Sequence, residues 1–181
     1  MRHTHAMTIR ISDVNADTFS DLLCRCCVYW ESPDQFRKVS DEEGEKIKRE
    51  WFEATSAAIG PCGKVLYVDD VPAAYCQYAP PAHLPGVRGY DTLSSQVDPD
   101  AIFISCLTVR EEYRGQGLGT RLLREVIEEC RERGCKAIET FARDDSDDNC
   151  SGPTRFYLKQ GFVSVATWVP KASLSLMRLE T

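Results

Sequence analysis

Residues 113–120 read Tyr-Arg-Gly-Gln-Gly-Leu-Gly-Thr, and this stretch decides the fold of the chain. It follows an apolar run, residues 101–109 (AIFISCLTV), and precedes a long amphipathic stretch, residues 120–134. A strand that turns through glycines into a helix presents backbone N–H groups that have no partner inside the helix and lie at the positive end of its dipole. Glycine lets the backbone approach a ligand closely, and Arg114 adds a fixed positive charge. The stretch therefore predicts a binding site for a pyrophosphate.

The spacing of the glycines excludes two common phosphate-binding loops. No Gly-Lys-Ser/Thr follows, as a P-loop requires, and residues 115–119 (GQGLG) lack the G-x-G-x-x-G spacing of the dinucleotide-binding fingerprint. The stretch resembles instead the acetyl-CoA loop of the GNAT superfamily of N-acetyltransferases. That family's pattern, Gln/Arg-x-x-Gly-x-Gly/Ala, is matched by Arg114, Gly117 and Gly119.

A second motif of that family lies closer to the C-terminus. Residues 156–162 (FYLKQGF) are similar to the family's Phe/Leu-Tyr-x-x-x-Gly-Phe, and the resemblance covers residues 67–162 well. It implies the GNAT acyl-CoA N-acyltransferase fold, an α/β fold with a mixed central sheet and a splayed parallel strand pair flanked by helices. The two splayed strands are expected around Leu107 and Ile138, with the pantetheine arm of the cofactor in the gap.

Hydrophobic periodicity along the chain agrees with an α/β sandwich. The strands are expected at residues 8–12, 64–69, 71–78, 101–109, 136–143, 162–169 and 172–179, and the helices at residues 15–30, 40–59, 120–134 and 151–161. Residues 8–181 are expected to form a single GNAT acetyltransferase domain, and residues 1–7 a lead-in or a tag remnant.

Several segments carry specific expectations about packing. The first helix is expected to bury its apolar stripe, Phe19, Leu22, Leu23, Cys26, Cys27 and Trp30. The second helix is expected to begin with a capping box, Ser40 and Glu43, and to bury Ile47, Trp51, Ala54 and Ala58. The third is expected to bury Leu118, Leu122, Leu123, Val126, Ile127 and Cys130, and to end at Gly134. Residues 80–100, with four prolines and two glycines, predict a long irregular loop that is functional or mobile.

Composition limits the partners of the chain. The net charge of −6 argues against sequence-independent binding of nucleic acid and suits a cationic acceptor such as an amine. No apolar run reaches the length of a membrane span, and the N-terminus has no apolar signal-peptide core. The nine cysteines are therefore expected to be reduced in a cytoplasmic protein. No metal is predicted, and the resemblance implies that a homodimer can form.

The resemblance also assigns roles in the transfer of an acetyl group from acetyl-CoA, the co-substrate, to a small-molecule or peptide amine. The residues implied to bind the cofactor are Leu107, Thr108, Val109, Arg114, Gly115, Gln116, Gly117, Leu118, Gly119, Thr120, Ser151 and Phe156. The N–H groups of Leu107 and Val109, left unpaired where the strands splay, are the expected oxyanion donors. Tyr157 is the expected acid for the departing thiolate, because a phenol is protonated at neutral pH. Ser151 is also expected to cap the short helix that follows it.

The general base that deprotonates the amine has three candidates. Glu139 is a charged residue in an otherwise apolar strand, and some peptide N-terminal acetyltransferases of the family have a base at the matching position. The alternative is that Glu139 is solvated or paired. His83 lies in the 80–100 loop and has a suitable pKa, and a relay through water would need no dedicated base.

The cysteines leave two further interpretations open. Cys24 and Cys27 form a C-x-x-C that can bind zinc or cycle between thiol and disulfide, although Cys26 and Cys27 also fit the apolar stripe of the first helix. Cys106, in the strand beside the expected thioester, would be the acyl carrier of a two-step mechanism. A different class of function, a non-catalytic module that senses acyl-CoA or docks a partner, would retain the fold without turnover.

Overall fold

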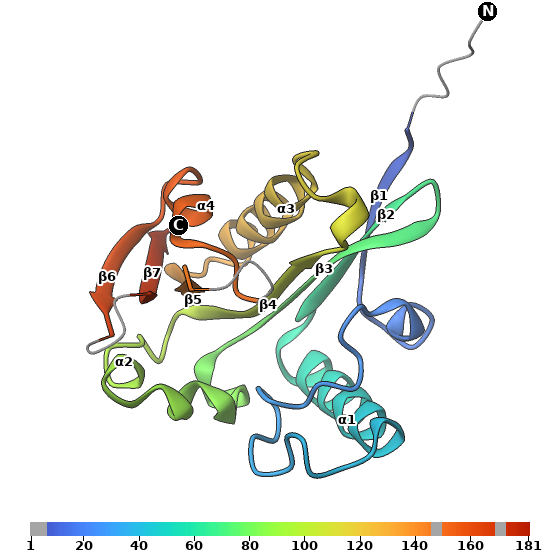
Figure 1. The fold of residues 1–181 in the computed structure, drawn as a ribbon, viewed down its shortest axis with the longest axis horizontal. Helices are drawn as coiled ribbons and strands as arrows, with labels where there is room; N and C mark the ends of the chain where they lie inside the picture. The colour runs from blue at the N-terminus through green and yellow to red at the C-terminus, as the bar shows by residue number, and fades with distance from the viewer. Residues whose placement is uncertain (1–6, 146–149, 169–172) are drawn as a thin grey trace, which may run out of the picture.

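The computed structural model describes residues 7–145, 150–168 and 173–181. They form a seven-stranded mixed sheet in the order β1-β2-β3-β4-β5-β7-β6, with α3 and α4 on one side of it and α1 and α2 on the other (Figure 1). The strands are β1 (Ile9–Asp13), β2 (Gly63–Val68), β3 (Val71–Ala79), β4 (Ile102–Val109), β5 (Ala137–Arg143), β6 (Val163–Thr167) and β7 (Leu174–Glu180). The helices are α1 (Asp41–Ile59), α2 (Asp91–Ser94), α3 (Leu118–Glu132) and α4 (Thr154–Leu158). Residues 1–6 of the expected lead-in (residues 1–7), residue 169 of the strand expected at residues 162–169 and residue 172 of the strand expected at residues 172–179 lie outside the described residues.

The splayed strand pair is confirmed by the register of the sheet. β4 and β5 are parallel and pair only at their beginnings, Ile102 with Ile138, Phe103 with Glu139 and Ile104 with Thr140. Beyond these three pairs, β4 continues to Val109 on its other neighbour, β3, and β5 continues to Arg143 on β7. A gap therefore opens between β4 and β5 toward the carboxyl ends of both strands, as in the predicted fold.

Two local predictions hold because they depend on neighbouring residues. The strands expected at residues 64–69 and 71–78 form a hairpin, in which Asp69 and Asp70 have φ angles of 48° and 64°, the left-handed pair that a tight turn requires. The predicted stripe of α3 is entirely buried, and the helix ends at Glu132, two residues before Gly134, whose φ of 70° is typical of the position after a C-terminal cap.

The expected first helix, residues 15–30, is wrong. The Asn15 side chain accepts hydrogen bonds from the N–H groups of Asp17 (2.9 Å) and Thr18 (3.2 Å), as the N-cap of a helix does, but the helix does not continue. Only the 3-10 turn η1 (Phe19–Asp21) follows, and Leu22 is already extended. Phe19 and Leu22 pack with Phe52 of α1, whereas Trp30 stacks on Tyr90 in a different part of the core.

Helix α1 begins at its predicted cap, where the Ser40 hydroxyl accepts from the Glu43 N–H at 3.2 Å, but it buries a different face from the one predicted. The buried residues are Gly44, Lys48, Phe52 and Thr55, while Ala54 and Ala58 are exposed and Ile47 and Trp51 are half-buried. Gly44 is required because a Cβ there would collide with the Cys26 carbonyl oxygen. Lys48 can be buried because the carboxylate of Glu31, which precedes the helix in the chain, neutralises its charge.

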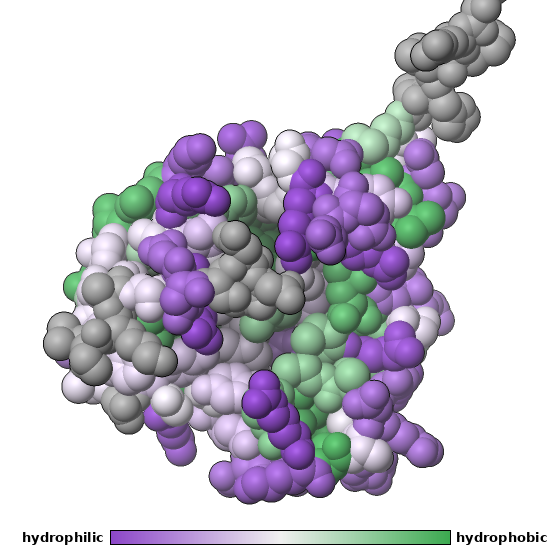
Figure 2. Space-filling model, viewed as in Figure 1, coloured by the Kyte–Doolittle hydropathy of each residue, from purple (hydrophilic) through white to green (hydrophobic). Residues whose placement is uncertain are grey.

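Residues 80–100 form a series of short turns, η2 (Pro81–His83), η3 (Pro85–Tyr90) and α2. Leu84, Val87 and Leu93 are buried in them and pack in one cluster with Phe103 and Phe141 of the sheet. This segment therefore contributes to one of the three clusters of the hydrophobic core and is not an open loop. Figure 2 shows hydrophilic residues around most of the rim of this view of the molecule, with more hydrophobic residues toward its middle. No helix within the described residues is both long and apolar enough to span a bilayer.

Candidate active site

A groove with a volume of about 610 Å³ lies beside the glycine stretch, between β4, the start of α3 and α4. Ten of the predicted cofactor residues line it: Leu107, Thr108, Val109, Arg114, Gly115, Gly117, Leu118, Gly119, Thr120 and Phe156. Gln116 and Ser151 do not line the groove. Ser151 is buried, and the next residue, Gly152, lines the groove. The structure thus brings the two sequence motifs, about 40 residues apart in the chain, to the two walls of one groove.

The backbone of the groove has the conformation that the glycines were expected to provide. Gly115 and Gly117 have φ angles of 75° and 78°, which L side chains rarely adopt, and Gly117 is the N-cap of α3. A Cβ on Gly119 would lie 3.4 Å from the Val109 side chain, an ordinary contact, so Gly119 is not demanded by strain. Backbone N–H groups at the start of α3 therefore line the groove at the positive end of a helix of 15 residues.

Three cationic side chains surround the groove. The Arg114 Nε donates to the Val109 carbonyl oxygen at 3.1 Å, which holds the guanidinium beside the end of β4. Arg155 and Lys159 line the opposite wall from α4 and the turn that follows it. Sequence reasoning missed these two, although Arg155 directly precedes the second motif and Lys159 lies within it, and their i, i+4 spacing places them on one helix face. The groove therefore presents positive charge to an anionic ligand from both walls.

Tyr157 does not line the groove but lies directly behind two residues that do, Gly152 and Phe156. Its side chain is 0% exposed, and its hydroxyl donates to the Ser151 carbonyl oxygen at 2.6 Å. Burial raises the pKa of Tyr157 well above its usual value. The phenol therefore keeps its proton at neutral pH.

Residues 150–152 lie in the gap between the splayed strands. The Leu107 N–H donates to the Cys150 carbonyl oxygen at 2.8 Å, and the Arg143 N–H donates to the Gly152 carbonyl oxygen at 3.0 Å. The expectation that splaying leaves the Leu107 N–H unpaired is therefore wrong for this structure. Both the predicted oxyanion donor and the Tyr157 hydroxyl are bonded to the same three-residue segment. A ligand that needs these donors has to replace the carbonyl oxygens of Cys150 and Ser151.

The helix after this segment is not capped by Ser151. It begins at Thr154 with Pro153 at the N-cap, and the Thr154 N–H is bonded to the Asp144 carboxylate at 2.8 Å. Proline at this position fixes the backbone without supplying a cap, so an acidic residue from the preceding loop takes that place.

Neither side chain considered as a base lines the groove. Glu139 is 0% exposed and lies opposite Phe103, where β4 and β5 are still paired. It accepts hydrogen bonds from the Arg178 guanidinium at 2.7 Å and 2.5 Å and from the Asp98 N–H at 2.9 Å. Burial raises the pKa of Glu139 in spite of these partners. His83 sits in η2, where its carbonyl oxygen accepts from the Trp51 indole at 2.7 Å.

A buried polar network that no sequence pattern indicated lies on the α1 side of the sheet. The Lys48 ammonium contacts the Glu31 carboxylate at 2.9 Å and the Gln77 amide oxygen at 3.1 Å. The Tyr75 hydroxyl also donates to the Gln77 oxygen, at 2.5 Å. Among the hydrogen bonds of the described residues, none reaches the second oxygen of Glu31, which is buried. The members of this network come from three segments, namely β3, α1 and the segment that contains Glu31, and only folding brings them together.

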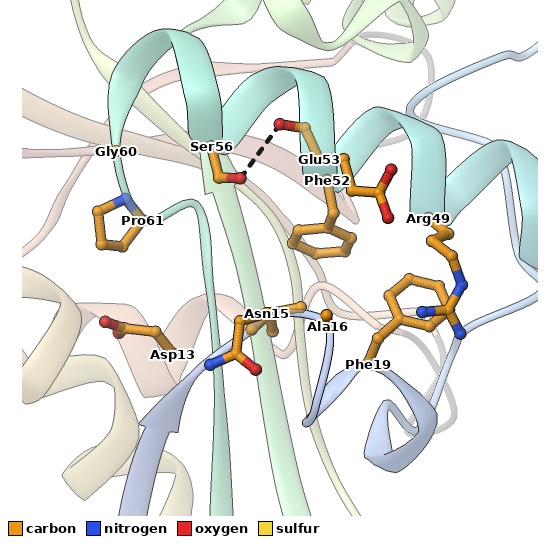
Figure 3. A pocket seen from close by; sticks show the side chains of 11 residues that line it. Asp13, Asn15, Ala16, Phe19, Arg49, Phe52, Glu53, Ser56, Gly60 and Pro61 are labelled. Carbon is orange, nitrogen blue, oxygen red and sulfur yellow. Dashed lines mark hydrogen bonds between the residues drawn. The ribbon is translucent and has the colours of Figure 1, made fainter.

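A second cavity, of about 380 Å³, lies between η1, α1 and the end of β1. Figure 3 shows Asp13 and Asn15 facing Phe52 and Glu53 across it, with Ser56 bonded to the Glu53 carbonyl oxygen. It shares no lining residue with the groove beside the glycine stretch. None of the predicted cofactor or catalytic residues lines it, so the groove is the site that the sequence motifs define.

Comparison with known proteins agrees with this geometry. The model of the family described as the acetyltransferase (GNAT) family matches residues 25–162, and the chain belongs to this family of N-acetyltransferases. No curated protein matches the sequence.

Similar solved structures include three acetyltransferases. The PaiA N-acetyltransferase from Thermoplasma acidophilum, in complex with coenzyme A, is 15% identical with a TM-score of 0.59, covering 96% of this chain and 99% of that one. Arabidopsis thaliana Naa50, with the bisubstrate analogue CoA-Ac-MVNAL, is 17% identical with a TM-score of 0.57 and coverages of 96% and 99%. The ribosomal-protein-S18-alanine N-acetyltransferase from Escherichia coli is 16% identical with a TM-score of 0.56 and coverages of 96% and 94%. At these identities the likeness establishes the fold.

Proposed function

We propose that the chain is an acetyl-CoA-dependent N-acetyltransferase that moves the acetyl group directly from the thioester to an amine. The observation that carries the proposal is the groove itself, which has a cationic glycine stretch at a helix N-terminus on one wall and, on the other, Gly152 and Phe156 in front of the buried Tyr157. The wall with the glycine stretch suits the pyrophosphate of coenzyme A, and the wall backed by Tyr157 suits its sulfur. Relatives in the family are N-acetyltransferases, which favours catalysis over an acyl-CoA-sensing module.

The residues of the groove divide the work of such a transfer. Residues 114–120 would bind the pyrophosphate, assisted by Arg155 and Lys159, and residues 107–109 would hold the pantetheine arm. The amine nitrogen attacks the carbonyl carbon of the thioester, and the Leu107 N–H stabilises the oxygen that gains charge. The carbon–sulfur bond then breaks, and the thiolate takes the proton of Tyr157. We assign the loss of the amine proton to water, because Glu139 is engaged by Arg178.

The acceptor is a primary amine of a small molecule or of a peptide. Two of the similar structures are named for protein or peptide acceptors, an alanine of a ribosomal protein and the peptide analogue MVNAL. The net charge of −6 favours a cationic acceptor over an acidic one. We place the enzyme in the cytoplasm, where its cysteines stay reduced, and consider a homodimer compatible with the fold.

Turnover against a panel of amines tests the proposal. Release of free coenzyme A thiol is expected with at least one peptide N-terminus or small polyamine, and the acetylated amine should be recovered in equal amount. The enzyme mixed with acetyl-CoA alone should gain no 42 Da adduct, because direct transfer forms no acetyl-enzyme. Binding of acetyl-CoA without thiol release from any amine would favour the sensing module, and a stable acetyl group on Cys106 would favour the two-step mechanism.

Gly117 offers a test of the pyrophosphate site. Gly117→Ala places a side chain at a φ of 78°, which costs about 1–2 kcal/mol. The unbound loop relieves that strain by moving, and coenzyme A must restore the original backbone, so we expect up to about tenfold weaker binding by calorimetry. Gly134→Ala is the matched control. Its φ is 70°, it also has open space around an added Cβ, and it lies at the far end of α3. Equal loss of affinity in both variants would contradict the assignment.

A further inference from the structure

Three cysteines from distant parts of the chain meet on the α1 side of the splayed strands. Cys106, in β4, is 3% exposed and belongs to the core cluster formed with Phe52 of α1. Cys24 and Cys150 are partly exposed and pack against the same cluster. The Leu107 N–H bond to the Cys150 carbonyl oxygen places the backbones of β4 and residue 150 side by side. The three residues are free thiols in this structure.

Their surroundings distinguish the three thiols chemically. The neighbouring thiols of Cys106 and Cys27, and then the ammonium of Lys48, lower the pKa of Cys24 well below its usual range against the effect of burial. The contacts with Cys150 and Cys24, together with complete burial, raise the pKa of Cys106 well above its usual value. Lys48 is one of the network members already described, with Glu31 and Gln77 as its partners. The contact with Cys106 lowers the pKa of Cys150 as well. The buried Cys106 thus lies between two partly exposed thiols that ionise more readily than it does.

We propose that Cys24 and Cys106 form a peroxide-reactive thiol pair. The Cys24 thiolate attacks one oxygen of hydrogen peroxide or an organic hydroperoxide, the O–O bond breaks, and Cys24 becomes a sulfenic acid as hydroxide or alkoxide leaves. The Cys106 thiol then attacks the Cys24 sulfur, and a disulfide forms with loss of water. The two thiols give up two electrons, and the peroxide accepts them. The partial exposure of Cys24 gives the oxidant access, and burial keeps Cys106 beside it.

Oxidation of this pair is expected to slow acetyl transfer, because the pair lies near the strand that would hold the thioester. This consequence rests on the proposed function. The cofactor groove is lined by Leu107, Leu118 and Phe156, which face the α3 side of the sheet. An acceptor amine must therefore reach the thioester from the other side of the gap, where Cys24 and Cys106 lie. A disulfide between them joins residue 24 to the strand residue next to Leu107 and narrows that approach. The oxidised protein is expected to bind coenzyme A but to turn over slowly.

Peptide mapping tests the pair independently of any activity. The full chain is treated with hydrogen peroxide, blocked with N-ethylmaleimide and cut with trypsin. Cleavage at arginine puts Cys24, Cys106 and Cys150 on separate peptides, residues 11–25, 89–110 and 144–155. We expect a disulfide that joins the first two peptides. It should be absent in Cys24→Ser, a variant of a partly exposed residue, and present in the matched control Cys26→Ser. Cys26 is exposed as a residue, and the partial desolvation of its thiol, together with the nearby carboxylate of Asp41, raises its pKa.

Several results would overturn the inference. They are oxidation of Cys26 as fast as that of Cys24, a disulfide of Cys106 with Cys150 in place of Cys24, or stoichiometric zinc bound to the cysteines of the purified protein. The functional arm compares thiol release before and after oxidation. A loss of at least tenfold that dithiothreitol restores, without a change in the calorimetric affinity for coenzyme A, is the expected result; undiminished turnover of the disulfide form would contradict the blocking effect. If the reduced protein shows no transfer at all, the proposed function fails, while the mapped disulfide still decides on the thiol pair.

Discussion

Tyr157→Phe is expected to lower kcat about 100-fold or more while the calorimetric dissociation constant of acetyl-CoA changes by less than about threefold. The phenol is the buried proton-bearing group of the second motif, and it lies directly behind the groove residues Gly152 and Phe156. Its hydroxyl is bonded to the Ser151 carbonyl oxygen in the free protein, so it has to exchange this acceptor for the sulfur as the segment 150–152 yields. Phenylalanine keeps the ring contacts with Phe156 and Phe162 but supplies no proton.

The pH dependence of kcat gives a second readout of the same role. Because burial raises the pKa of Tyr157, the acid stays protonated while the pH passes the usual value of a phenol, and the wild-type rate should not fall there. The acceptor amine loses its proton as the pH rises, so the rate should increase until that amine is neutral. A fall of kcat near the usual pKa of a phenol would mean that a different, exposed group donates the proton.

Tyr78→Phe is the matched control for this experiment. Tyr78 is equally buried in the same core cluster, and its hydroxyl donates to Glu129 of α3 at 3.0 Å, away from the groove. Removing one buried hydroxyl costs about 1 kcal/mol of stability in either variant. Turnover should therefore fall in Tyr157→Phe alone. Equal rates in the two variants would remove Tyr157 from the mechanism.

The parts of the fold that could be predicted depend on residues close together in the sequence. The left-handed Asp69-Asp70 turn, the apolar stripe of α3 and the glycine stretch that opens it are each set by interactions within about one turn or one hairpin. The groove followed from them, because a loop at the end of β4 must lie beside α3. The lining residues Arg155 and Lys159 were missed only because their helix is five residues long and shows little periodicity.

The parts that could not be predicted depend on distant partners. Residues 15–30 have helical periodicity, yet the helix does not continue after Asn15, and Phe19 and Trp30 pack in two different clusters. The occupied gap between β4 and β5 has the same origin. The Leu107 N–H is bonded to the carbonyl oxygen of Cys150, 43 residues later in the chain. A pattern of neighbouring residues cannot predict such a bond.

The buried pair of Lys48 and Glu31 predicts the largest effect on stability. Lys48→Met is expected to lower the free energy of unfolding by about 3–5 kcal/mol, because it leaves the Glu31 carboxylate buried without its cation. Among the described residues, Gln77 alone remains to bond it, and none of them bonds the second oxygen of Glu31. Urea unfolding at pH 7 measures the loss. Lys46→Met, two residues away on the exposed face of α1 and 3.8 Å from Glu43, should change it by less than about 0.5 kcal/mol.

A second substitution tests whether this loss comes from the buried charge. Glu31→Gln combined with Lys48→Met removes the uncompensated carboxylate charge and should recover most of the loss at pH 7. A double variant as unstable as Lys48→Met would show that packing of the lysine stem, and not its charge, stabilises the core.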